Sequence, residues 1–148
     1  MVDFASGGFV SAGYRAAYRL GGLTLGVIFA AVGILFLFRP EAVVLFFNGI
    51  ARARGMGESP LPAASLYLAL AAAFMYLVTL LALGLYSRPD VPLYAWLVVH
   101  AKSASALVSL LLCVLAGVRL IYIANALVDG AIALAVAHVA WRGRVRRR

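Results

Sequence analysis

The chain has 148 residues, of which 66% are hydrophobic and only 12% are charged. Soluble domains are roughly 45–50% apolar and about 25% charged, so a water-soluble fold of this size could not bury so much apolar surface. The composition therefore excludes a soluble enzyme, a disordered chain and a disulfide scaffold. It indicates an integral membrane protein, and the length predicts a single domain over residues 1–148.

Four apolar stretches are long enough to cross a bilayer as helices, because a hydrocarbon core about 30 Å thick needs about 20 helical residues. Their continuous apolar runs lack the alternation that is typical of barrel strands. The first fourteen residues contain no basic side chain, so we do not expect the first span to be a cleaved signal peptide. The sequence predicts an all-α fold, a transmembrane four-helix bundle with spans at residues 20–38, 65–86, 93–116 and 120–141.

The long connection between the first two spans predicts a further helix. Pro40 suits the first turn of a helix, and Glu41, Asn48 and Arg52 then lie near one face. The opposite face carries apolar side chains, namely Val43, Phe46, Phe47 and Ile50. This pattern predicts an additional amphipathic interfacial helix at residues 40–52, and a bent continuation of the first span is the alternative. A loop rich in glycine and proline follows.

The net charge of +8 comes mostly from basic residues outside the spans, including a tail of five arginines. Four spans place both termini on one side, which also receives Arg15, Arg19 and Arg88. The other side receives fewer, namely Arg39, Arg52, Arg54 and Arg119. Since basic loops stay cytoplasmic, we expect a multi-pass protein of the cell inner membrane with both termini in the cytoplasm.

The same charge distribution bears on partners. A basic cluster next to a span is typical of contact with anionic lipid headgroups, which we expect at the tail formed by Arg142, Arg144, Arg146, Arg147 and Arg148. The basic residues lack the aromatic interleaving of a nucleic-acid surface, so nucleic acid is not an expected partner. Besides the lipid bilayer, the expected partners are further copies of the chain or a larger membrane complex.

Two charged residues lie deep inside predicted spans, Lys102 in the third and Asp129 in the fourth. An ionised group near the bilayer centre costs at least about 2.5–3.5 kcal/mol, so neither is expected to face lipid. Counted from a turn near Val118, their axial offset is about 7.5 Å, which a lysine side chain can nearly cover. We therefore predict that Lys102 and Asp129 pair across a helical hairpin.

Helical spacing places other polar side chains on the same stripes. Ser105 and Ser109 share the stripe of Lys102, while Tyr122 and Asn125 share that of Asp129. These residues form the predicted ligand-binding site or polar core. Two interpretations stay open: a structural pair that fixes which helix faces inward, or a lining for a cavity that takes a proton, an ion, a quinone or a polar headgroup.

Helix packing is indicated in the first span, where Gly22 and Gly26 have a spacing that lets another helix approach closely.

Catalytic signatures are absent: the sequence has no glycine-rich phosphate loop, no paired cysteines and no zinc-binding His-Glu spacing. We therefore predict no catalytic residues and no metal ligands, favour a non-enzymatic protein, and leave any cofactor unknown.

A family resemblance adds to this interpretation. Three features resemble the DoxX-like group of small bacterial membrane proteins. They are the plan of four compact spans, the glycines within residues 20–33, and the turn Phe38-Arg39-Pro40-Glu41 leading into residues 42–49. The resemblance implies an accessory role in the membrane or association with a small molecule. It assigns no role to Lys102 or Asp129.

Together these features predict a non-enzymatic integral membrane protein that acts as an accessory subunit or binds a lipid-like or quinone-like molecule through its polar site. The alternative is a small proton-coupled carrier, which would work as an oligomer because four helices enclose little volume. The carrier would need a water-accessible route to Asp129.

Overall fold

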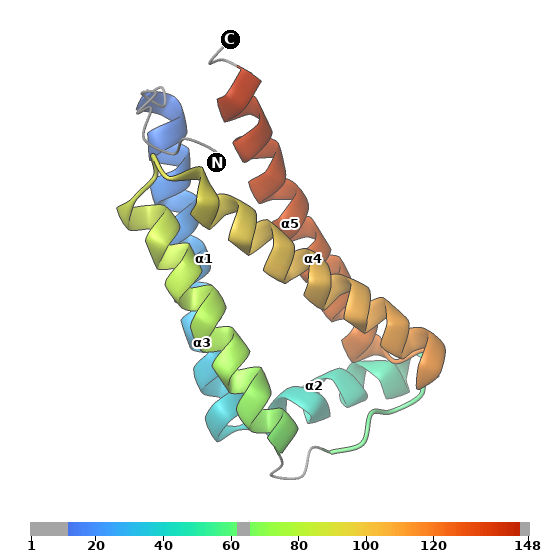
Figure 1. The fold of residues 1–148 in the computed structure, drawn as a ribbon. Helices are drawn as coiled ribbons and strands as arrows, with labels where there is room; N and C mark the ends of the chain where they lie inside the picture. The colour runs from blue at the N-terminus through green and yellow to red at the C-terminus, as the bar shows by residue number, and fades with distance from the viewer. Residues whose placement is uncertain (1–11, 62–65, 146–148) are drawn as a thin grey trace.

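The computed structural model describes residues 12–61 and 66–145, and every regular element within them is a helix (Figure 1). The helices are α1 (Ala12–Phe38), α2 (Pro40–Ala53), α3 (Leu66–Ser87), α4 (Pro92–Leu115) and α5 (Leu120–Val145). Four of them are long and apolar enough to cross a membrane, at Arg15–Phe38, Leu68–Ser87, Pro92–Leu115 and Leu120–Arg142. The prediction of an all-α protein with four spans is confirmed. Ser65, the predicted start of the second span, lies outside the described residues.

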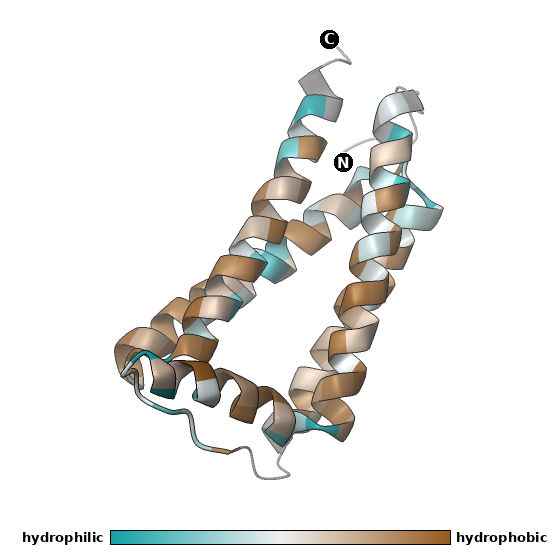
Figure 2. Cartoon of the chain, turned by 180° about the vertical axis from the view of Figure 1, so that it is seen from behind, coloured by the Kyte–Doolittle hydropathy of each residue, from teal (hydrophilic) through white to brown (hydrophobic). Residues whose placement is uncertain are grey.

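The four long helices form two antiparallel pairs, α1 with α3 and α4 with α5. Figure 1 shows the pairs together at the end that carries the termini and apart at the opposite end, where α2 runs between them. The larger core lies at the first of these ends, where Tyr18, Leu85, Val98 and Val136 bring together one side chain from each long helix. Outward surfaces are apolar along most of each helix (Figure 2), as lipid contact requires.

Helices α1 and α3 approach each other through glycines. A methyl group built at Gly22 would lie 2.6 Å from the amide nitrogen of Tyr86 and 2.8 Å from the carbonyl oxygen of Ala82. One turn further, a methyl group at Gly26 would lie 3.1 Å from the Leu83 side chain. The predicted glycine face therefore packs against α3 of the same chain, which leaves it closed to a partner protein.

Helices α4 and α5 are joined by a short turn and pack through small side chains. Gly117, two residues after the end of α4, adopts a φ of +88°, a left-handed conformation that suits glycine. Ala106, Ala126 and Ala133 are buried between the helices, and a methyl group at Gly130 would just touch that of Ala106. Small residues let the two backbones come close over most of their length.

The additional helix α2 is separate from α1. Between them Arg39 has a φ of −140° and a ψ of 50°, which breaks the helix, and the chain then turns across the end of the bundle (Figure 1). A bent continuation of the first span is therefore the wrong alternative. On the polar face of α2 Asn48 is only 6% exposed, while Phe46 on the apolar face is 65% exposed.

Asn48 is buried because it holds the loop that follows α2. Its amide donates a hydrogen bond of 2.8 Å to the carbonyl oxygen of Ser59, and its carbonyl oxygen accepts one of 2.8 Å from the Ser59 amide. Arg52 donates two hydrogen bonds to Glu58, of 2.9 and 3.0 Å. The loop also forms an isolated bridge between Gly57 and Arg119. These contacts tie α2 to the turn between α4 and α5.

The basic residues divide between the two ends as the sequence predicted. Arg15, Arg19, Arg88 and Arg142 lie at the end with the termini, in the first turns of α1, after α3 and late in α5. Arg39, Arg52, Arg54 and Arg119 lie at the other end. The last three arginines of the predicted tail, Arg146, Arg147 and Arg148, lie outside the described residues.

Candidate functional site

The buried ion pair is the centre of the candidate site. Lys102 on α4 and Asp129 on α5 are 3% and 4% exposed, and the lysine Nζ donates a hydrogen bond of 2.8 Å to Asp129 Oδ1. The pairing predicted across the helical hairpin is therefore present. Each charge is kept away from the outer surface of the bundle, which is the arrangement expected for ionised groups within a membrane.

Two aromatic rings from the other helix pair complete the surroundings of the lysine. The Lys102 Nζ lies 4.3 Å from the ring centroid of Phe29 on α1 and 6.0 Å from that of Phe74 on α3. Both distances fall within the range of about 6 Å for attraction between a cation and an aromatic face. The ammonium group thus contacts three other helices, and it links the α4–α5 pair to the α1–α3 pair.

Sequence reasoning missed both phenylalanines. Phe29 is one of the most buried side chains, at 2% exposure, but nothing in an apolar span distinguishes an aromatic ring that packs inward from one that faces lipid. A signal that could have found Phe29 is its place on the Gly22–Gly26 side of α1, since 26 and 29 are neighbours on a helix surface.

A second polar cluster lies one turn closer to the turn between α4 and α5. The Asn125 side-chain amide donates hydrogen bonds of 2.7 Å to Ser109 Oγ and 3.2 Å to Ser105 Oγ. The structure thus brings together five of the six predicted residues in two adjacent clusters. Tyr122, the sixth, is half-buried and does not line the cavity next to Lys102.

A cavity of about 260 Å³ adjoins the ion pair. Lys102, Ser105, Asn125 and Asp129 form its polar wall. The remaining wall is apolar and aromatic, and it comes from three helices: Ile28, Phe29, Val32, Phe36, Ala71, Phe74, Met75, Val128 and Ile132. The cavity is therefore a small apolar chamber with one hydrogen-bonding side.

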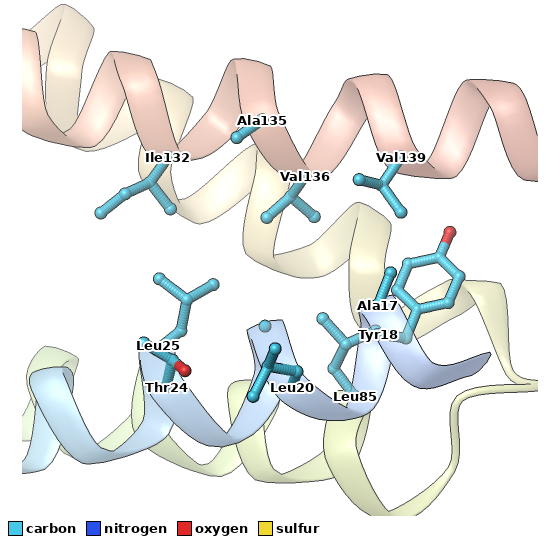
Figure 3. A pocket seen from close by; sticks show the side chains of 11 residues that line it. Ala17, Tyr18, Leu20, Thr24, Leu25, Leu85, Ile132, Ala135, Val136 and Val139 are labelled. Atoms are coloured by element: carbon cyan, nitrogen blue, oxygen red, sulfur yellow. The ribbon is translucent and has the colours of Figure 1, made fainter. Parts of the chain in front are cut away.

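A larger cavity of about 520 Å³ lies in line with the first, between α1 and α5, and we call it the α1–α5 groove (Figure 3). Its wall on α5 runs from Ile132 to Val139, and its wall on α1 runs from Ala17 to Leu25. Ile132 lines both cavities. Polar atoms are nearly absent from the groove, so its chemistry differs sharply from that of the chamber at Lys102.

The site offers binding chemistry. A lysine ammonium has three donors and an ionised carboxylate accepts at two oxygens, so the single bond between Lys102 and Asp129 leaves capacity on both groups. Asp129 is the one acidic residue within the four spans, so chemistry that needs two carboxylates has no second member there.

No family model, curated protein or solved structure matches the chain. The DoxX-like resemblance consequently stays a prediction. The class of protein follows from the fold alone: four apolar helices of spanning length fit a multi-pass integral membrane protein.

Proposed function

We propose that this is a non-enzymatic membrane protein that binds a lipid-like or quinone-like molecule at Lys102 and Asp129. The observation that carries the proposal is the position of the ion pair, whose two buried charges form part of the polar wall of a mostly apolar cavity. An accessory subunit of a larger membrane complex, in the sense that the DoxX-like resemblance implies, would use the same binding site.

The energetics of buried charge support a binding role. Desolvation offsets much of the attraction within a buried ion pair, and apolar residues of similar size often hold a fold equally well. A bundle that needed only packing could therefore place leucine at both positions. The Lys102 ammonium can donate to a carbonyl oxygen, while the rings of Phe29 and Phe74 favour a flat partner. A quinone head or a lipid ester has these properties.

We propose that the protein lies in the cell inner membrane with both termini in the cytoplasm. This orientation follows from the excess of basic residues at that end, where Arg142 joins Arg15, Arg19 and Arg88. Helix α2 would then lie in the outer interface, where Phe46 and Leu45, 65% and 55% exposed, can enter the headgroup region.

The test compares the parent protein with the double variant Lys102→Met/Asp129→Asn, which removes both charges together and leaves no buried ion alone. Each protein is purified from its native membrane into nanodiscs, and small molecules are extracted and identified by mass spectrometry. Beyond any phospholipid that both proteins retain, we expect a quinone or lipid in near-stoichiometric amount with the parent and its loss from the double variant. A short-chain quinone should raise the melting temperature of the parent alone.

Ser103→Ala, on the same helix as Lys102, is the matched control and should keep the ligand. Equal ligand content in the parent and the double variant would refute binding at this pair. Proton flux into proteoliposomes that depends on Asp129, without a retained ligand, would instead support the proton-coupled carrier.

A further inference from the structure

The α1–α5 groove reaches close to the ends of the membrane spans on the side of the termini. The span in α1 begins at Arg15 and the groove begins at Ala17, while in α5 the groove ends at Val139 and the span ends at Arg142. Figure 3 shows Ile132, Val136 and Val139 of α5 facing α1 across it. The end of the groove on this side therefore lies within two or three residues of the headgroup region.

The groove extends over most of the depth of one leaflet. Its walls extend over residues 17–25 and 132–139, which is about 10–12 Å of helix at 1.5 Å per residue. Half of a hydrocarbon core is about 15 Å. The groove ends near mid-depth at Ile132, so its length suits a lipid chain that descends from one interface and stops at the centre of the bilayer.

The charge at the mouth of the groove is positive. Arg142 is exposed and follows Val139 by three residues, so it lies on the adjoining face of α5 one turn beyond the groove. In the part of the chain that the structure describes, Asp90 is the acidic residue at this end, and it already forms an ion pair of 3.7 Å with Arg15. Further arginines follow Arg142 in the sequence. The mouth is thus complementary to a negatively charged headgroup.

From this depth and charge, we infer that the α1–α5 groove holds one acyl chain of an anionic phospholipid from the leaflet on the side of the termini, with its phosphate near Arg142. This lipid site is separate from the ligand site at Lys102 and does not depend on it. One bound phospholipid would thus account for the expected contact between the basic tail and anionic lipid. The acyl chain of this lipid also fills the space between the two helix pairs.

Gly21 provides a direct test, because it lines the groove and a methyl group built there meets nothing within 4 Å. Gly21→Leu should therefore fill the groove without disturbing the helices. Gly13→Leu is the matched control, since Gly13 is also on α1 with nothing within 4 Å and does not line the groove. Arg142→Gln removes the proposed headgroup contact. All variants are prepared as the full chain in nanodiscs.

The measurement is the phospholipid retained by each protein, counted by native mass spectrometry, in phosphatidylcholine discs with and without phosphatidylglycerol. We expect the parent and Gly13→Leu to retain one phosphatidylglycerol and Gly21→Leu to retain none. Arg142→Gln should weaken retention about fivefold, as loss of one basic contact near a membrane surface implies. Helix content by circular dichroism should be the same in all four proteins.

Three results would overturn the inference. The first is equal retention of phosphatidylglycerol by Gly21→Leu and the parent. The second is evidence that an anionic lipid is not needed. A parent that retains phosphatidylcholine and phosphatidylglycerol equally would show this, and so would a parent that inorganic phosphate stabilises equally in phosphatidylcholine discs. The third is a parent dimer that Gly21→Leu converts to a monomer, which would identify a second copy of the chain as the occupant.

Discussion

Helices α1 and α3 meet through glycines, whereas α4 and α5 meet through alanines and buried polar side chains. In the first pair a single methyl group at Gly22 would overlap backbone atoms of Tyr86 and Ala82. In the second pair Lys102 bonds to Asp129, and Asn125 bonds to Ser109. The packing of α1 on α3 therefore depends on the volume of the side chains at the contact, whereas the packing of α4 on α5 depends on hydrogen bonding and charge.

This difference shows how a thin bundle can hold together within lipid. Apolar side chains gain little by leaving a hydrocarbon solvent, so helices need either close backbone packing or polar contacts to associate. Each pair uses mainly one of these, and Lys102 joins the pairs through the rings of Phe29 and Phe74. We therefore expect the two pairs to respond to opposite kinds of substitution.

The largest effect is expected at the ion pair. Asp129→Asn leaves the Lys102 ammonium buried without a counter-charge, and breaking a buried pair in this way costs about 3–5 kcal/mol. The free energy of unfolding, measured by denaturant titration in mixed micelles, should fall by this amount. The double variant Lys102→Met/Asp129→Asn should recover most of the loss. A parent and Asp129→Asn of equal stability would show that the pair contributes nothing to the bundle.

A smaller loss is expected in the glycine pair. Gly22→Ala forces α1 and α3 apart, and overpacking of this kind costs about 1–3 kcal/mol. Its neighbour Gly21 has open space, so Gly21→Ala should be neutral or stabilising by about 0.5–1 kcal/mol through better helix propensity. The same unfolding titration measures both. If the two substitutions had the same effect, close backbone packing would not be what holds this pair.

The smallest effect is expected outside both pairs, at the loop after α2. Hydrogen bonds from Arg52 lower the pKa of the Glu58 carboxyl, and the same contact raises the pKa of Arg52. Because the folded-state pKa of Glu58 is lowered, the pair stabilises the loop above the ordinary glutamate pKa. This contribution is lost as the pH falls through the lowered folded-state pKa.

A carbon NMR titration of the Glu58 carboxyl in nanodiscs measures this pKa. Arg52→Gln should raise the titration midpoint to the ordinary glutamate value, while Arg54→Gln, at an exposed arginine two residues away, should leave it unchanged. An unchanged midpoint in Arg52→Gln would contradict the cause given for the shift.

Parts of the candidate site could be predicted because membrane helices leave few options for charge. Lys102 and Asp129 are opposite charges at similar depth in two helices joined by a short turn, so pairing was the expected way to shield both. Asn125 and the two serines followed from the same helical spacing. The burial of Asn48 could not be predicted, because the hydrophobic pattern of α2 contains no information about the loop that returns to this residue at Ser59.

The sequence by itself determined the membrane class, the four spans, the extra helix and the pairing of Lys102 with Asp129. These features follow from local apolar length, proline and glycine positions, and the cost of isolated charge in lipid. Only the tertiary structure decided that α1 packs on α3, that Phe29 and Phe74 face the lysine, and that an apolar groove lies between α1 and α5. Those outcomes depend on how each apolar helix is rotated about its axis, and a helix that is apolar on all sides does not encode that rotation in its hydrophobic pattern.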